Sequence, residues 1–146
     1  MIDKKPKIAI SIGDLNGIGI EIALKCHEKI SKICTPIYCI NNKMLKLASE
    51  ELKIQIPNDF EIFKTKGEFE IKPGIVSKKS GRYSYDSFMD AINLAKNNEV
   101  DAICTLPINK EAWNKANIKY KGHTEVLRDF FGKNAIMMLG CKKMFV

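Results

Sequence analysis

A short apolar strand that runs through a glycine-rich turn into a helix constrains the fold of this chain more than any other feature. Lys7 to Ile12 (KIAISI) form an apolar, β-branched run, which is typical of a buried strand. The turn from Gly13 to Gly19 follows, and from Ile18 to Ile30 apolar residues recur at three- and four-residue steps, which predicts a helix. This unit favours an α/β fold.

The same alternation continues along the chain. We expect further strands at residues 36–40, 61–63, 100–105 and 135–139, and further helices at 44–51, 83–97, 109–116 and 124–131. Residues 58–81 mix glycine and proline with short apolar pairs, which predicts loops and an irregular hairpin. Continuous apolar strands between helices predict an α/β fold with a mostly parallel sheet and helices on both faces.

Length and composition indicate one folded domain over residues 1–146, with 45% hydrophobic and 28% charged residues. No apolar stretch approaches the roughly 20 residues of a membrane-spanning helix, and the first apolar run is too short for a secretory signal. We therefore expect a cytoplasmic protein with no membrane partner.

The net charge of +7 raises the possibility of a polyanion partner. However, only Arg82 and Arg128 are arginines, and base and phosphate recognition favour arginine. The lysines are also dispersed, so we expect no nucleic-acid partner, and a polyanion-binding module is a minor alternative.

The cysteines contain no CxxC pair, which argues against a disulfide framework and a zinc knuckle. We expect free, buried thiols at all five positions: Cys26, Cys34, Cys39, Cys104 and Cys141.

The turn Gly13-Asp14-Leu15-Asn16-Gly17-Ile18-Gly19 is the first candidate ligand site, because its glycines bring backbone amides close to a ligand. Its G-x3-G-x-G spacing matches neither the dinucleotide fingerprint nor the Walker loop, and Asp14 places a negative charge where a phosphate would bind. The alternative is a tight turn in which Asp14 or Asn16 caps the helix. We also expect a positive φ at Gly19.

Two further polar segments precede predicted helices. Thr105 to Lys110 (TLPINK) follow a strand, where α/β proteins bind ligands, although Asn109 could simply cap the next helix. Gly122-His123-Thr124-Glu125 could hold a polar substrate or move a proton near neutral pH, or could be a capping box centred on Thr124. His27 is expected on the solvated surface of its helix.

Four segments in this order resemble the 4-hydroxythreonine-4-phosphate dehydrogenase family of vitamin B6 (pyridoxal phosphate) biosynthesis. They are GD-x-x-GIG-x-E at 13–21, S-G-x-x-S at 80–84, T-x-P-I-N-K at 105–110 and G-H-T-E at 122–125. The resemblance runs across the chain but covers only the amino-terminal part of such an enzyme. The sequence also stops just after a new apolar segment begins, so we expect Met144 to Val146 to be exposed. We therefore expect the chain to be a fragment of a longer protein.

The resemblance implies the amino-terminal portion of a two-domain, homodimeric enzyme with an isocitrate/isopropylmalate dehydrogenase-like fold. Such enzymes use NAD or NADP to oxidise 4-phosphooxy-L-threonine to 2-amino-3-oxo-4-phosphooxybutanoate, which decarboxylates to 3-amino-2-oxopropyl phosphate. A divalent metal (zinc, magnesium or cobalt) polarises the reacting hydroxyl. Its three histidine ligands are expected beyond Val146, so this chain alone is expected to be inactive.

Carried over residue by residue, the family's substrate-binding pair falls on His123 and Thr124. No catalytic residue and no metal ligand is assigned within this chain. Leu15 and Ile20 stand where many members have proline, which affects the rigidity of the turn but removes no functional group. The alternative enzyme is a sibling metal-dependent dehydrogenase of a related hydroxy acid phosphate.

Overall fold

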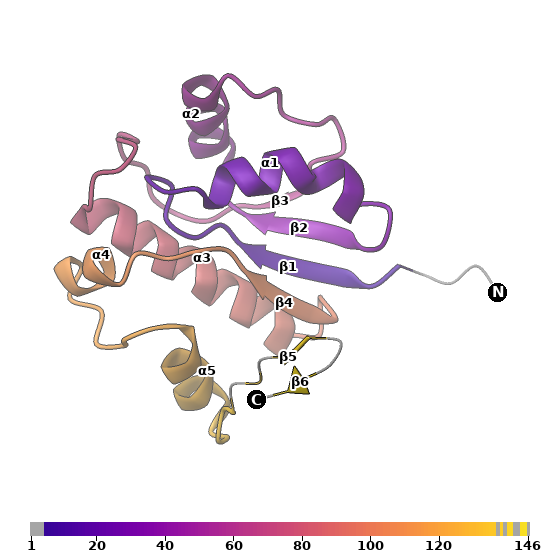
Figure 1. Ribbon diagram of the computed structural model, residues 1–146, viewed down its shortest axis with the longest axis vertical. Helices are drawn as coiled ribbons and strands as arrows, with labels where there is room; N and C mark the ends of the chain where they lie inside the picture. The colour runs from indigo at the N-terminus through magenta and orange to yellow at the C-terminus, as the bar shows by residue number, and fades with distance from the viewer. Residues whose placement is uncertain (1–4, 137, 139, 142–143, 146) are drawn as a thin grey trace.

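A parallel sheet forms the centre of the molecule (Figure 1). The computed structural model describes residues 5–136, 138, 140–141 and 144–145. The sheet has the order β3-β2-β1-β4 and consists of β1 (Lys7–Ser11), β2 (Thr35–Cys39), β3 (Ile62–Phe63) and β4 (Ala102–Thr105). The helices are α1 (Gly19–Ile30), α2 (Asn42–Leu52), α3 (Lys78–Lys96), α4 (Lys110–Lys115) and α5 (His123–Phe131). A two-residue antiparallel pair, β5 (Gly140–Cys141) and β6 (Met144–Phe145), forms a second, separate sheet.

Helices cover both faces of the sheet because the side chains of β1 alternate between two apolar clusters. Ile10 and Ile12 belong to a cluster that includes residues of α1 and α2, whereas Ala9 packs with Ala91 and Leu94 of α3. Full burial of an aliphatic side chain of this size contributes about 1.5–3 kcal/mol. The predicted fold class is confirmed, and Figure 1 shows α1 and α3 on opposite sides of the sheet.

A third cluster joins α3, α4 and α5 through Phe88, Trp113 and Val126. The Trp113 indole Nε1–H donates to Ser84 Oγ at 2.7 Å, which satisfies the only polar group of a fully buried side chain. A Cβ on Gly81 would lie 2.1 Å from the Ala112 carbonyl oxygen, so a glycine is required where α4 crosses α3. The S-G-x-x-S segment therefore packs α4 against α3.

The region between β3 and α3 differs from the prediction in two ways. β3 pairs with β2 in parallel, so the expected hairpin is wrong, although residues 64–77 are loop as predicted. α3 begins at Lys78 rather than at residue 83, because the Ser77 side chain accepts a hydrogen bond from Ser80 N at 3.0 Å and caps the helix.

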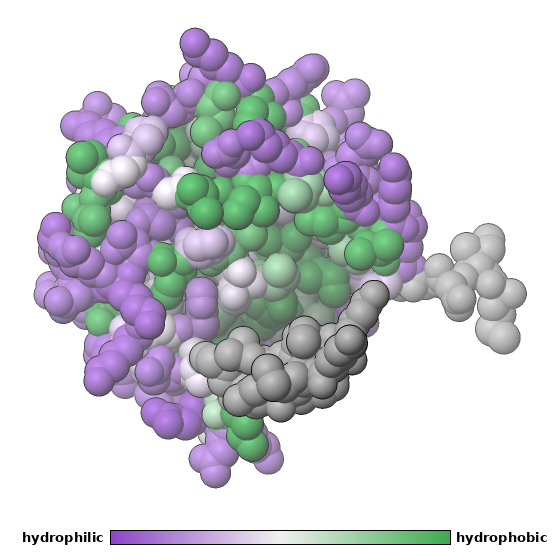
Figure 2. Space-filling model, viewed as in Figure 1, coloured by the Kyte–Doolittle hydropathy of each residue, from purple (hydrophilic) through white to green (hydrophobic). Residues whose placement is uncertain are grey.

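β4 lies at the edge of the described sheet, and three of its four residues are exposed, which contradicts the expectation of a buried strand. Ala102 and Cys104 pair with Ile8 and Ile10 of β1, and both are exposed. Figure 2 shows apolar surface in the middle of the view, below the position of α1 in Figure 1.

The strand expected at residues 135–139 is wrong at Ala135, Ile136 and Met138, which lie outside any strand. Ile136 is 90% exposed, so no helix or strand in the described part of the chain covers it. Met137 and Leu139 lie outside the described residues.

The cysteines are only partly as expected. Cys34 and Cys39 are buried and free, Cys26 is half-buried, and Cys104 is exposed at the edge strand. Burial raises the pKa of the Cys39 thiol to about 12, which keeps it protonated and unreactive. The side chain of Cys141 lies outside the described residues. None of the helices in the described ranges is long and apolar enough to cross a membrane.

Candidate functional site

The glycine-rich turn and the segment Thr105 to Lys110 meet at the carboxyl ends of β1 and β4. Asp14 N donates to the Pro107 carbonyl oxygen at 2.9 Å. Gly13 has φ +71°, and a Cβ there would lie 2.3 Å from the same oxygen. Gly13 is therefore required both by its left-handed backbone and by the close approach of Pro107.

Gly19 does not have the expected positive φ. A glycine is needed there for a different reason, since a Cβ at this position would lie 2.8 Å from the Ile12 carbonyl oxygen. The missing side chain lets the first turn of α1 approach the end of β1.

The polar residues of the turn do not cap α1. The N-cap position is Ile18, which makes no side-chain hydrogen bond. Asp14 Oδ1 instead accepts from Asn16 N at 2.9 Å, within the turn itself. The capping alternative for Asp14 and Asn16 is wrong.

Asn16 joins the glycine-rich turn to the loop that precedes α3. Its Oδ1 accepts from Lys72 N at 2.9 Å, its Nδ2 donates to the Ile75 carbonyl oxygen at 2.7 Å, and its backbone oxygen accepts from Gly74 N at 2.8 Å. Asn16 is only 5% exposed, so these bonds are shielded from water. Residues 72–75 are thereby fixed beside the turn.

These three segments line a half-open cavity of about 260 Å³, formed by the turn, by Gly74 and Ile75, and by Pro107 to Asn109. A larger hollow of about 600 Å³ lies near the amino ends of β1 and β4, beside Lys7 and Asp101, and contains no motif residue. Ligands of open α/β sheets bind at the carboxyl ends of strands, so the smaller cavity is the candidate site.

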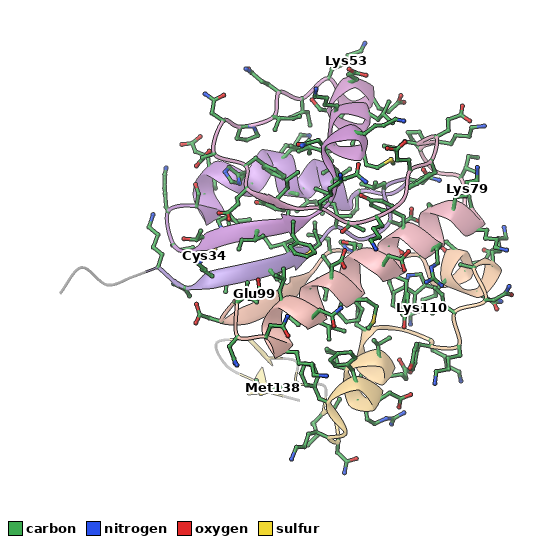
Figure 3. The ribbon with its side chains drawn as sticks, turned by 180° about the vertical axis from the view of Figure 1, so that it is seen from behind. Cys34, Lys53, Lys79, Glu99, Lys110 and Met138 are labelled. Atoms are coloured by element: carbon green, nitrogen blue, oxygen red, sulfur yellow. The ribbon has the colours of Figure 1, made fainter. Side chains whose placement is uncertain are left out.

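Asn109 has two roles at this cavity. Its Oδ1 accepts from Ala112 N at 2.9 Å and caps α4, as the alternative interpretation predicted. It also lines the cavity. Lys110 follows at the start of α4 and is exposed, at the same end of the molecule as Lys79 (Figure 3).

His123 is the first residue of α5 and packs edge-on against two aromatic rings. Its ring centroid lies 4.6 Å from that of Phe88 and 5.8 Å from that of Trp113. Burial lowers the pKa of His123 below its usual 6.5, which favours the neutral imidazole at neutral pH. Its Nε2 is buried without a hydrogen-bond partner among the described residues, so the ring retains an unused polar atom.

Thr124 does not cap α5, because the N-cap position is Gly122 and makes no side-chain hydrogen bond. A Cβ on Gly122 would lie 3.8 Å from Lys110 Cε, which places the third motif beside the start of α4. Neither His123 nor Thr124 lines the 260 Å³ cavity. The structure thus joins the first two motifs in one cavity and places the third next to the second.

His27 is not on the solvated surface, as its position beside Glu28 and Lys29 had suggested. It is 1% exposed, with Nδ1 3.0 Å from the Tyr38 hydroxyl and Nε2 3.1 Å from Asp59 Oδ1. Its spacing from the buried Ile20 and Leu24 was the sequence signal that could have revealed this position.

The available donors do not fit a metal centre. Among the residues that the structure describes, no group of three or more His, Cys, Asp or Glu side chains is placed to hold a metal ion. His27 Nδ1 lies at hydrogen-bond distance from the Tyr38 hydroxyl, and the His123 ring packs against aromatic rings.

Residues 32–146 match the family model described as pyridoxal phosphate biosynthetic protein PdxA. The chain belongs to this family. It is 60% identical over 142 residues to the 4-hydroxythreonine-4-phosphate dehydrogenase of Sulfurimonas denitrificans and 59% identical over 141 residues to that of Campylobacter fetus. Both alignments cover 97% of this chain but 46% of the relative, so the chain spans about half the length of these PdxA proteins.

Solved structures of the PdxA family have the same architecture. The crystal structure of a 4-hydroxythreonine-4-phosphate dehydrogenase from Burkholderia phymatum gives a TM-score of 0.81 at 26% identity, covering 98% of this chain and 49% of that one. The family resemblance carried by the four segments is confirmed, and the chain corresponds to the amino-terminal part of that fold.

Proposed function

We propose that this chain forms the amino-terminal half of a 4-hydroxythreonine-4-phosphate dehydrogenase that oxidises 4-phosphooxy-L-threonine with NAD or NADP in pyridoxal phosphate biosynthesis. The observation that carries the proposal is the contact of Gly13 and Asp14 with Pro107. This contact builds a cavity from two family motifs at the carboxyl edge of the sheet. The proposed reaction class, a dehydrogenation, is taken from the names of the relatives.

His123 and Thr124 bind the phosphorylated substrate in this proposal. The His123 Nε2 atom has no partner among the described residues, and its neutral ring is able to make a hydrogen bond to a phosphate or hydroxyl oxygen. Lys110 lies beside this segment and adds a positive charge that attracts the phosphate. The role of His123 is therefore to hold the substrate.

The bound nicotinamide supplies the oxidising power by accepting a hydride. The glycine-rich turn does not have the spacing of either standard phosphate loop, and Asp14 lies within it, so no residue of this chain is assigned to the cofactor phosphates. The family resemblance assigns the metal ligands to the part of the enzyme beyond Val146, so no residue of this chain is assigned to the metal.

The assembly and location follow the same proposal. Residues 1–146 form the amino-terminal α/β portion, the complete enzyme is a homodimer, and it works in the cytoplasm on a phosphorylated hydroxy amino acid. The cleft between its two domains then contains the cavity described above.

The test compares this chain with its full-length form, the polypeptide continued over the other half of the family's length. With 4-phosphooxy-L-threonine, NAD or NADP and a divalent metal, the full-length form is expected to produce reduced nicotinamide, measured by its absorbance. The 146-residue chain is expected to produce none. Absence of turnover by the full-length form would contradict the proposal, and turnover of a related hydroxy acid phosphate instead would identify a sibling dehydrogenase.

A further inference from the structure

The S-G-x-x-S segment of α3 holds Trp113 in two ways. Ser84 Oγ accepts a hydrogen bond of 2.7 Å from the Trp113 indole Nε1–H, and both side chains are fully buried. Gly81 brings the backbone of α4 against α3, since a Cβ there would lie 2.1 Å from the Ala112 carbonyl oxygen. Contacts with α3 therefore fix both the place of α4 and the orientation of the indole.

The imidazole of His123 packs against the same tryptophan. It lies edge-on to two rings, with interplanar angles of 80° to Trp113 and 78° to Phe88. Phe88 belongs to α3 and Trp113 to α4, so the first residue of α5 contacts both preceding helices. Packing of this kind restricts the rotamers of a side chain and thereby sets the direction in which its polar atoms point. A chain of contacts thus leads from Ser84 through Trp113 to His123.

The orientation of the His123 Nε2 atom depends on this packing. Nε2 is buried and makes no hydrogen bond to the described residues, so no hydrogen bond fixes its direction. Lys110 and Glu125, the charged groups at this junction, lie beside Gly122. Burial lowers the pKa of His123, and the two rings supply part of that burial. The aromatic contacts therefore control both the direction of the ring and its exposure to water.

From these contacts we propose that Ser84 and Trp113 are positioning residues for the substrate contact made by His123. This inference rests on the proposed function, in which His123 binds the phosphorylated substrate. Ser84 holds the indole of Trp113, and the indole holds the imidazole in the orientation that presents Nε2 to the substrate. Neither residue lines the candidate cavity, so both act only through His123. Their effect on substrate binding should disappear when the imidazole is absent.

The experiment measures KM and kcat for 4-phosphooxy-L-threonine in the full-length form. Ser84→Ala and Trp113→Phe each remove the same hydrogen bond, and each is expected to raise KM by about 2- to 5-fold and to change kcat by less than about twofold. The double variant is expected to raise KM no further than the larger single effect. In a His123→Gln background, both substitutions are expected to change KM by less than about 1.5-fold.

Ser49→Ala is the matched control. It removes a hydrogen bond of 2.6 Å from a half-buried serine of α2 to the Ile54 carbonyl oxygen, outside the aromatic junction, and is expected to leave KM unchanged. A purely structural role of Ser84 would reduce the fraction of folded enzyme, which lowers the apparent kcat and leaves KM as it was. The division of the effect between KM and kcat therefore separates positioning from stability.

A second readout requires no turnover. NMR titration of the His123 imidazole in the full-length form is expected to give a pKa below 6.5 in the wild type. In Ser84→Ala, where the indole is no longer held and water reaches the ring more easily, the pKa is expected to move toward 6.5. Ser49→Ala is expected to titrate as the wild type does. An identical titration in Ser84→Ala and the wild type would overturn the positioning role.

The kinetic outcomes separate this inference from the proposed function. An unchanged KM in both Ser84→Ala and Trp113→Phe would overturn the inference alone, as would the same rise in KM with and without His123. An unchanged KM in His123→Gln would overturn the role of His123 and this inference with it. Absence of turnover by the wild type would overturn the proposed function itself and both assignments that rest on it.

Discussion

The junction at Gly13 and the junction at His123 are built in opposite ways. At the first, backbone meets backbone, because Asp14 N bonds to Pro107 O and no Cβ fits between Gly13 and that oxygen. At the second, side chains meet, and His123 rests on Phe88 and Trp113 with a buried nitrogen unpartnered among the described residues. The first junction consists of backbone contacts between two segments of this chain and acts as a scaffold, whereas the second contains the nitrogen to which we assign the proposed ligand contact.

The largest expected effect is at the backbone junction. Gly13→Ala combines the cost of a left-handed alanine with a clash against Pro107 O, so we expect a loss of about 3–5 kcal/mol in the free energy of unfolding. Gly132→Ala is the matched control, since Gly132 has φ +60° but open space around it, and should cost about 1–2 kcal/mol. Urea denaturation measures both, and equal losses would show that the contact with Pro107 is not tight.

Asn16→Ala tests the loop that is attached to the same junction. It leaves the Lys72 N–H and the Ile75 carbonyl without partners, and we expect a loss of about 2–3 kcal/mol together with faster hydrogen exchange at Lys72. Asn97→Ala removes an exposed bond to Glu99 and is expected to change stability by less than about 0.5 kcal/mol. Unchanged hydrogen exchange at Lys72 in Asn16→Ala would contradict the role of Asn16 in holding residues 72–75 beside the turn.

Ser84→Ala tests the aromatic junction. It leaves the buried Trp113 Nε1–H without its acceptor, and the expected loss is about 1–2 kcal/mol. A double-mutant cycle with Trp113→Phe should give a smaller loss for Ser84→Ala in the phenylalanine background, because the N–H is then absent. The same loss in both backgrounds would exclude the hydrogen bond as its cause.

The smallest expected effect is a pH dependence at His123. Because burial lowers its pKa below 6.5, the unfolded chain binds a proton at higher pH than the folded chain does. The stability gained from the neutral, buried ring is complete above pH 6.5 and is lost as the pH falls through the lowered pKa. Between about pH 7.5 and about pH 5.5 the wild type should therefore lose more stability than His123→Gln. Parallel curves would contradict the assigned environment.

The sequence alone correctly predicted the elements that are determined by local sequence patterns. The apolar run of β1, the periodicity of α1 and the glycine spacing predicted the unit that forms one wall of the cavity. The four motifs also predicted the family. These features depend on side-chain alternation and turn chemistry, which neighbouring residues determine.

The errors arose where distant residues decide the outcome. His27 is buried because Tyr38 of β2 and Phe60 of the loop before β3 pack against it. A glycine is needed at position 19 because of the nearby end of β1 and not because of its own φ. The exposure of β4 depends on which strands lie beside it, and its own apolar run does not determine this. Packing partners of this kind have no signal in the local pattern.

The most direct test of the central claim, that the His123 junction binds substrate, is the KM for 4-phosphooxy-L-threonine in the full-length form of His123→Gln. We predict an increase of about 10-fold, a smaller increase of about 2- to 5-fold for Thr124→Val, and no increase for the control His27→Gln, whose ring is engaged with Tyr38. An unchanged KM in His123→Gln would contradict the claim, and loss of bound metal in that variant would instead place His123 among the metal ligands.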